Sequence, residues 1–140
     1  MADWYGAARS NYVRLNCSVE AFREALGPFA SSIRVSPSGS DSSRVCLLAE
    51  TYDGGWPSLA SDDSGEDIEF SFQEYVVPYL AEGQVLIVMQ SGHEKLRYVD
   101  GHASAFAWDD REVHLGLWDI RDLAAKTFGI PAEQISEASY

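Results

Sequence analysis

The chain has 140 residues, of which 46% are apolar and 12% aromatic, and its formal net charge at pH 7 is −12. This length suits one domain with a buried core, and the apolar content argues against disorder. Ten Lys and Arg against twenty-two Asp and Glu cannot easily build a basic face, so direct binding to nucleic acid or to an anionic membrane is disfavoured.

The sequence has no obvious membrane anchor or export signal. Its longest apolar run, Val85–Met89, is too short to cross a bilayer. Residues 1–5 lack the basic segment followed by an apolar one that marks a signal peptide. Cys17 and Cys46 do not make a disulfide framework. We therefore expect a cytoplasmic protein.

The first third of the chain alternates strand and helix signals. Tyr12–Leu15 alternates in polarity and predicts a first strand. Ser18 is a suitable N-cap for a helix whose apolar stripe ends at Gly27, before a proline. Ile33–Val35 and Arg44–Leu48 then predict two paired strands around a Ser- and Gly-rich turn.

The middle of the chain changes in composition. Thr51–Asp67 is rich in Gly, Ser and Asp without a sustained period, so we expect a long surface loop. Ile68–Leu80 has apolar residues at helical spacing and predicts a helix. Pro78 should break or kink that helix near its end.

A strand pair is expected next. Gln84–Gln90 predicts a buried strand, Ser91–Glu94 a turn, and Lys95–Trp108 a long strand with two unlike faces. The odd positions of this long strand, between Val99 and Ala107, are small enough for a helix to lie close. The even positions, between Leu96 and Trp108, are larger and partly polar.

The C-terminal part supplies one more strand and one helix. Val113–Leu117 predicts a strand, and a helix should start near Asp119 and stop at Gly129. The resulting fold class is α+β, with three helices and an antiparallel or mixed sheet. The first six elements match the ferredoxin-like order, with an appended hairpin and C-terminal helix. We expect one domain over residues 1–131 and a flexible tail over 132–140.

Charge is distributed unevenly along the chain. Between Arg44 and Lys95 lie fifty residues without Lys or Arg, and ten of them are acidic. Such a stretch creates a negative field that selects cationic partners and repels nucleic acid. Those ten residues are Glu50, Asp53, Asp62, Asp63, Glu66, Asp67, Glu69, Glu74, Glu82 and Glu94.

Aromatic residues lie beside this acidic stretch. Tyr52 and Trp56 occupy a glycine-rich turn, where they could form a contact surface ringed by charge. The alternative is that Trp56 folds inward and plugs the core. For the first case, the predicted partner-binding residues are Tyr52, Asp53, Trp56, Asp62, Asp63, Glu66, Asp67 and Glu69.

Three histidines raise the question of a metal site. If the chain turns at residues 91–94, His102 pairs near Val85, and His93 lies roughly 30 Å away at ~3.3 Å per residue. His114 should pair near Phe106, on the order of 13 Å from His102. We therefore predict that the histidines share no metal ion.

Catalytic motifs are weak in this sequence. Cys17 precedes a helix start, which can activate a thiol, but no histidine base is near it in sequence. Asp62–Glu69 resembles a calcium loop only in composition. Paired carboxylates for glycoside hydrolysis have no spacing rule by which to recognise them. We predict no catalytic residue, no cofactor and no enzymatic activity.

Four segments support a resemblance to known proteins. Ser10–Val13, Gly55–Ser58, Glu94–Tyr98 and Leu117–Leu123 together resemble a family of small acidic proteins of phages, plasmids and other mobile elements. The context of that family is similar to that of anti-restriction and anti-CRISPR accessory proteins. The resemblance implies a protein that occupies a nucleic-acid-binding surface of a host defence complex, in the cytoplasm of the host cell if a phage encodes it.

Three hypotheses follow. The first is a non-enzymatic inhibitor that binds a basic surface of a defence nuclease or of its guide-RNA complex. The second is an immunity protein or antitoxin that neutralises a basic nuclease toxin, which composition cannot separate from the first. The third is a small-molecule enzyme or binder with the Trp56 loop as a lid over Tyr98, Asp100 and His102.

Overall fold

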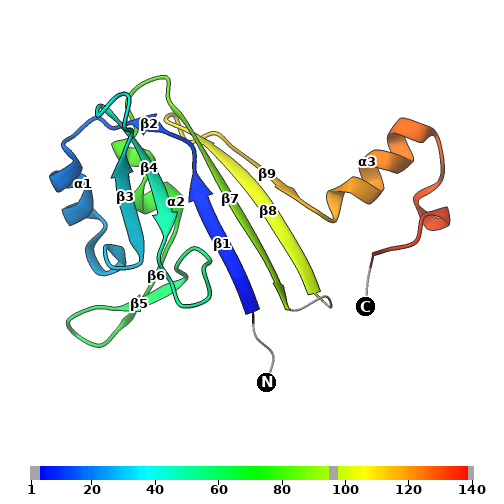
Figure 1. The fold of residues 1–140 in the computed structure, drawn as a ribbon, viewed down its shortest axis with the longest axis horizontal. Helices are drawn as coiled ribbons and strands as arrows, with labels where there is room; N and C mark the ends of the chain where they lie inside the picture. Colours follow the sequence, from blue (N-terminus) through cyan, green and yellow to red (C-terminus); the bar gives the residue numbers. More distant parts are fainter. Residues whose placement is uncertain (1–3, 95–97, 139–140) are drawn as a thin grey trace.

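An antiparallel sheet of seven strands organises the chain, whose computed structural model describes residues 4–94 and 98–138. One edge of β4 pairs with β3, and the other pairs in succession with β2 and β1. The sheet continues from β1 through β7 and β8 to β9 (Figure 1). Its strands are β1 Trp4–Ser10, β2 Val13–Arg14, β3 Ile33–Pro37, β4 Arg44–Ala49, β7 Val85–Glu94, β8 Tyr98–Ala107 and β9 Glu112–Gly116.

A break separates β1 from β2. The buried hydroxyl of Ser10 accepts a hydrogen bond from the backbone N–H of Leu47 at 2.7 Å. The Asn11 side chain bonds backbone groups of β7, accepting from the N–H of Ile87. These side chains satisfy backbone groups where regular pairing is interrupted. The predicted strand Tyr12–Leu15 corresponds to β2 alone, and β1 was not predicted.

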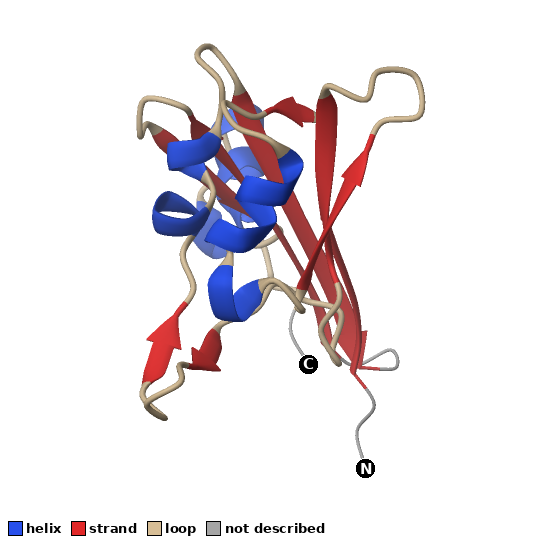
Figure 2. Cartoon of the chain, turned by 90° about the vertical axis from the view of Figure 1, so that its left-hand side faces the viewer, coloured by secondary structure: helices blue, strands red, loops and turns tan. Residues whose placement is uncertain are grey.

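Two short helices cover one face of the sheet, as Figure 2 shows. In α1, Val19–Ala25, the Ser18 hydroxyl caps the helix by accepting from the N–H of Ala21, which confirms the predicted start. A 3-10 turn, η1 (Gly27–Phe29), follows it. The helix α2 is Phe72–Tyr75 and is followed by η2, Val77–Tyr79.

The predicted helix over Ile68–Leu80 is wrong in its extent. Residues 67–69 form the strand β6, and Ser71 caps a helix of a single turn. Pro78 lies in η2, where its fixed φ and missing N–H suit a tight turn better than a helix interior. The apolar spacing reflects a buried segment that crosses the core in two short turns.

The hydrophobic core lies between the sheet and these helices. Phe22 of α1 and its C-cap residue Leu26 belong to one buried cluster with strand residues from both halves of the sheet. On β8 the core side is the even positions, since Phe106 is buried opposite Leu86. We expected a helix near the small odd positions of β8, but the two helices that contribute to the core lie on the other face.

The predicted turn at Ser91–Glu94 is wrong. β7 continues to Glu94, which pairs with Tyr98, and the connecting residues 95–97 lie outside the described part of the chain. A side chain at Gly92 would collide with the indole ring of Trp4, whose strand runs alongside. Gly92 therefore serves close packing between strands rather than a turn.

The segment predicted as a loop, Thr51–Asp67, contains regular structure. β5, Leu59–Ser61, pairs with β6, Asp67–Glu69, in a separate two-stranded sheet. The prediction missed this hairpin because each of its strands is only three residues long, which is too short for a clear alternation of polarity.

The C-terminal helix begins and ends where the sequence predicts. α3 is Asp119–Phe128, and Gly129 ends it in the left-handed conformation at φ 68°. In the segment expected to fray, η3 is Ala132–Gln134, and the Arg121 guanidinium bonds the carbonyls of Ala132 and Ile135. α3 extends away from the sheet (Figure 1). The predicted α+β class, with three helices and a mainly antiparallel sheet, is confirmed.

Candidate functional site

The β5–β6 hairpin, residues 59–69, carries half of the acidic residues of the cation-free stretch. Its turn is organised by Asp62, whose carboxylate accepts hydrogen bonds from the Ser64 hydroxyl at 2.6 Å and from two backbone N–H groups at 2.9 Å. These bonds, the hydroxyl bond first, hold the pKa of Asp62 below its usual value. Gly65 completes the turn at φ 83°.

The two faces of this hairpin differ. Ala60 and Ile68 are paired across the strands and are half-buried. On the opposite face, Asp67 and Glu69 are exposed together with Leu59. With the exposed Asp63 and Glu66 of the turn, the hairpin displays carboxylates outward while its apolar side faces the protein. We call residues 59–69 the acidic hairpin.

Aromatic side chains anchor both ends of the acidic hairpin. Phe70 follows β6 and packs edge-to-face against Phe29 and Phe72, at ring-centre distances of 5.1 and 4.9 Å. Trp56 precedes β5 and meets Phe72 edge-to-face at 5.2 Å. Such edge-to-face pairs are favourable beyond the area they bury. The hairpin is thereby fixed to the core at its base while its turn extends outward (Figure 2).

Trp56 therefore has the inward orientation that we weighed against a contact role. Its ring is partly buried against the core, and its indole Nε1 is shielded from solvent with no hydrogen-bond partner among the described residues. Its backbone N–H donates to the side chain of Gln90 at 3.0 Å. These contacts hold the segment against β7.

The loop before Trp56 packs its backbone against β1. Gly54 has φ 81°, and a Cβ there would lie 1.9 Å from the carbonyl oxygen of Gly6. The Asp53 carboxylate accepts from the Gly55 N–H and the Thr51 hydroxyl, in that order of effect, and both bonds lower its pKa. Asp53 thus shapes the loop, whereas the side chain of Tyr52 is fully exposed.

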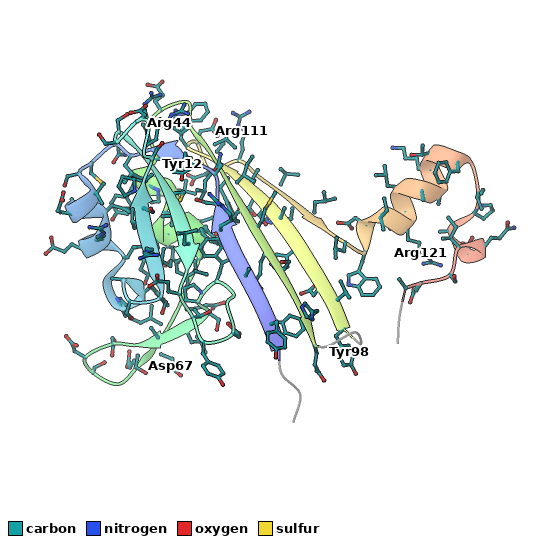
Figure 3. The ribbon with its side chains drawn as sticks, viewed as in Figure 1. Tyr12, Arg44, Asp67, Tyr98, Arg111 and Arg121 are labelled. Carbon is teal, nitrogen blue, oxygen red and sulfur yellow. The ribbon has the colours of Figure 1, made fainter. Side chains whose placement is uncertain are left out.

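Two arginines, Arg44 and Arg111, lie along the upper edge of the molecule in Figure 3, away from Asp67 of β6 near its lower edge. Of the ten acidic residues in the cation-free stretch, Glu50 is the one in an ion pair among described residues, with Arg34 at 3.4 Å. The carboxylates of the acidic hairpin therefore remain without a neutralising partner in the described structure.

The histidines lie closer together than the sequence predicts. His102 pairs with Gln90 rather than near Val85, and His93 pairs with Val99, so the two are roughly 10 Å apart along the strand. His93 stacks on Tyr5 at 5.5 Å, on the opposite face from His102. No cluster of three potential metal ligands occurs within residues 4–94 and 98–138.

The sequence analysis missed a row of polar side chains. His114 pairs opposite Ser104, and its Nδ1 lies 2.7 Å from the Ser104 hydroxyl. Its Nε2 lies 3.2 Å from the carboxylate of Glu112. Hydrogen bonds from Gln73 and then from His114 lower the pKa of Glu112. The exact register of β8 and β9 would have been needed to find this row.

This row has the order nucleophile, base and acid that serine hydrolases use. Hydrolysis also needs a substrate pocket and donors for an oxyanion. One hollow opens on the sheet face opposite α1 and α2, and another opens beside α3. Neither is lined by Ser104, His114 or Glu112. The row links β8, β9 and α2 at the surface, as cross-strand polar pairs do.

Comparison with known proteins finds no matching family model, no significantly similar curated protein and no significantly similar solved structure. None of the helices within the described residues is long and apolar enough to span a membrane.

Proposed function

We propose that this chain is a non-enzymatic binding protein whose acidic hairpin occupies a basic, nucleic-acid-binding surface of another protein. One observation carries the proposal: four exposed carboxylates, those of Asp63, Glu66, Asp67 and Glu69, project from a hairpin that has no ion pair in the described structure. A carboxylate that forms no ion pair within its own protein does not have to break one when it binds. It gains a favourable electrostatic interaction with a cationic surface. Tyr52, exposed on the neighbouring loop, supplies an aromatic contact.

The hairpin also has the rigidity that such binding requires. Asp62 fixes the turn, and Phe70 and Trp56 fix the base. A preorganised surface loses less conformational entropy on association than a mobile one. Asp67 also lies away from Arg44 and Arg111 (Figure 3), and the carboxylates of the acidic hairpin would attract a basic partner during its approach.

The resemblance to proteins of mobile elements favours a partner from a host defence complex, and hence a cytoplasmic site of action. Duplex DNA carries one negative charge per ~1.7 Å of axis, so its protein partners have dense basic surfaces. An acidic hairpin competes for such surfaces and does not bind nucleic acid itself. The proposed function is therefore that of an inhibitor of the anti-CRISPR or anti-restriction type.

A ferredoxin-like core is part of this proposal. The chain segments in order are β1 with β2, α1, β3, β4, α2 and β7, and the spatial order β7-β1-β4-β3 supports that arrangement. In it, the connection between β4 and α2 contains the acidic hairpin. A long insertion at that position is tolerated because it extends from a complete core.

The test compares two variants with equal changes in charge. The first neutralises four exposed carboxylates of the acidic hairpin and leaves Asp62 to hold the turn. Its substitutions are Asp63→Asn, Glu66→Gln, Asp67→Asn and Glu69→Gln. The control neutralises four exposed carboxylates elsewhere, namely Glu20→Gln, Glu24→Gln, Glu82→Gln and Glu133→Gln.

Each protein is used to capture partners from a nuclease-treated bacterial lysate at low and moderate salt, with mass spectrometry as the readout. We expect the wild type and the control to retain a nucleic-acid-binding protein that added duplex DNA displaces. The hairpin variant should lose it. Equal capture by both variants, or capture of no nucleic-acid-binding protein at either salt, would overturn the proposal.

A further inference from the structure

The sheet has a second face that no element of the described chain covers. The helices α1 and α2 lie on one side (Figure 2), and the other side exposes Val85, Ile87 and Met89 of β7. On β9, Val113 and Leu115 are exposed on the same side, since they pair with odd positions of β8. A sheet face of this composition is ordinarily buried.

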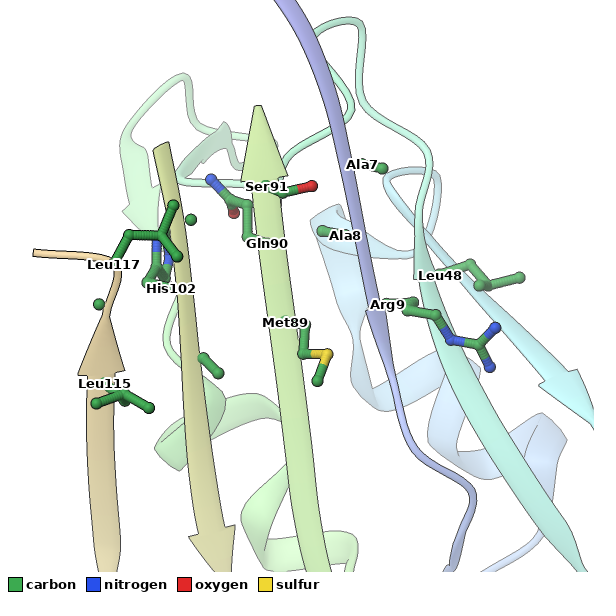
Figure 4. Close-up of a pocket in the computed structure, with 13 residues that line it drawn as sticks. Ala7, Ala8, Arg9, Leu48, Met89, Gln90, Ser91, His102, Leu115 and Leu117 are labelled. Carbon is green, nitrogen blue, oxygen red and sulfur yellow. The ribbon is translucent and has the colours of Figure 1, made fainter. Parts of the chain in front are cut away.

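Small residues form a trough along the middle of this face. Gly101, Ala103 and Ala105 of β8 lie between the larger side chains of β7 and β9. A hollow of about 600 Å³ opens there (Figure 4). Leu48, Met89 and Leu115 stand along it, and Arg9 is the one formally charged side chain among the described residues that line it. An α-helix can approach such a strand closely.

The helix α3 carries the matching surface. Ile120, Leu123 and Phe128 recur at helical spacing and are 64%, 56% and 70% exposed. Asp122 and Lys126 occupy the other side. A helix of ten residues is not stable by itself in water and depends on packing of its apolar side. Within the described structure that packing is supplied by few neighbours, mainly β9 and η3.

The junction between β9 and α3 prevents the helix from covering its own trough. The Leu117 N–H bonds the carbonyl of Gly101, and the Gly116 N–H bonds the Asp119 carboxylate at 2.6 Å. These bonds fix the direction in which the helix leaves the sheet, and that direction leads outward (Figure 1). In this structure α3 and the trough therefore do not meet within one chain.

The amount of exposed apolar surface suits a stable dimer. Thirteen large hydrophobic side chains of β7, β8, β9 and residues 117–130, Tyr98 included, are between 40% and 70% exposed. At roughly 100 Å² each, these side chains expose on the order of 1,000 Å² of apolar surface per chain. Each partner in a specific interface buries ~800 Å². The largest apolar patch of a typical monomer is only ~300–600 Å².

Charge does not oppose this association despite the net charge of −12. The acidic hairpin lies at the far end of the molecule from α3, as Asp67 and Arg121 show in Figure 3. The described residues that line the trough include Arg9 and no carboxylate, so Asp119 and Asp122 of α3 meet no like charge there. Repulsion between copies is thus kept away from the surfaces that meet, at a distance where physiological salt screens it.

We propose that this protein is a homodimer in which α3 of each copy lies in the trough of the other. Two such exchanged contacts are related by one two-fold axis, so the assembly closes at two copies. The inference does not depend on the role of the acidic hairpin.

The first test is the mass in solution, measured by light scattering during gel filtration over a series of concentrations. The wild type should have twice the mass of one chain. Leu123→Glu on α3 and Ala103→Glu in the trough should each reduce it to that of one chain. Lys126→Glu, on the polar side of the same helix, should leave the dimer intact. Circular dichroism verifies that each variant is folded.

The second test identifies the contact itself. In a Cys17→Ser background, one preparation carries Leu123→Cys and another carries Ala103→Cys. Mixed and oxidised, they should form a disulfide between position 123 of one copy and position 103 of the other. A wild type of single-chain mass at every concentration would overturn the proposal and leave the face to a different partner. A dimer that survives both glutamate variants would also overturn it.

Discussion

The side chain of Gln90 on β7 accepts a hydrogen bond from the backbone N–H of Trp56 at 3.0 Å, across thirty-four positions of sequence. This bond links the central sheet to the segment that leads into the acidic hairpin. Two residues separate Trp56 from the start of β5. The position of the hairpin thus depends on one polar contact and on the aromatic packing beside it.

Replacing Gln90 should loosen this link. Gln90→Ala leaves the partly buried Trp56 N–H without its acceptor, which should reduce the free energy of unfolding by about 1 kcal/mol. Urea denaturation measures the loss, and amide exchange at Trp56 should become faster. Gln134→Ala, at an exposed site in η3, serves as the control. Equal stability of the two variants would contradict the prediction.

The contact between Gly54 and Gly6 can be separated from the cost of the left-handed backbone. Gly65 has nearly the same φ as Gly54, 83° against 81°, but open space around it. Gly65→Ala should cost about 1 kcal/mol, for the backbone conformation alone. Gly54→Ala should cost clearly more, because its methyl group would overlap the Gly6 carbonyl. Thermal unfolding of both variants tests this, and similar losses would disprove a close approach.

The cap of α1 gives a third prediction. Ser18→Ala removes the acceptor for the Ala21 N–H and should lower the free energy of unfolding by about 1 kcal/mol. Ser18→Gly should lower the free energy of unfolding by only a few tenths of a kcal/mol, and Ser18→Asp should restore the cap. Urea denaturation of the three variants gives the order. An alanine variant as stable as the aspartate variant would show that the cap contributes nothing.

The turn of the acidic hairpin should depend on pH. Because hydrogen bonds from Ser64 and Glu66 lower the pKa of Asp62 in the folded protein, ionised Asp62 stabilises the turn. That contribution is complete above the ordinary aspartate pKa of ~3.9 and is lost as the pH falls through the lower folded value.

Amide exchange of Ser64 and Glu66, followed as the pH is lowered, tests this prediction after correction for the intrinsic rate. Their protection should fall in the acid range in the wild type. In Asp62→Asn it should be weak and nearly independent of pH. Asp63→Asn, a neutralisation at the adjacent position, should behave as the wild type. Protection in the wild type that stays constant into strong acid would refute the assignment.

Local signals allowed part of the fold to be predicted. Ser18 and Gly129 mark the ends of α1 and α3, and the turn after Pro37 marks the β3–β4 hairpin. In each case the residues that decide the structure are neighbours in sequence. The acidic composition of the hairpin was likewise visible in the sequence, because five of the ten carboxylates lie within the eight residues Asp62–Glu69.

Other features depend on contacts between distant residues. β1 forms because its partners are β4 and β7, and Gly92 continues a strand because Trp4 packs over it. The turn signals predicted the wrong register of β7 on β8. His102 was expected to pair near Val85, and it pairs with Gln90. A strand has little preference for its own conformation without its neighbours, so sequence alone could not choose among these pairings.

The sequence by itself determined the class of the fold, the ends of two helices and the cluster of carboxylates. The tertiary structure decided that Trp56 packs inward and that the carboxylates project without cationic partners. It also decided that the face of β8 with small side chains is left uncovered. Capping and charge density are properties of adjacent residues. Burial, exposure and the choice of face are properties of the packed chain, since one shift in strand register exchanges them.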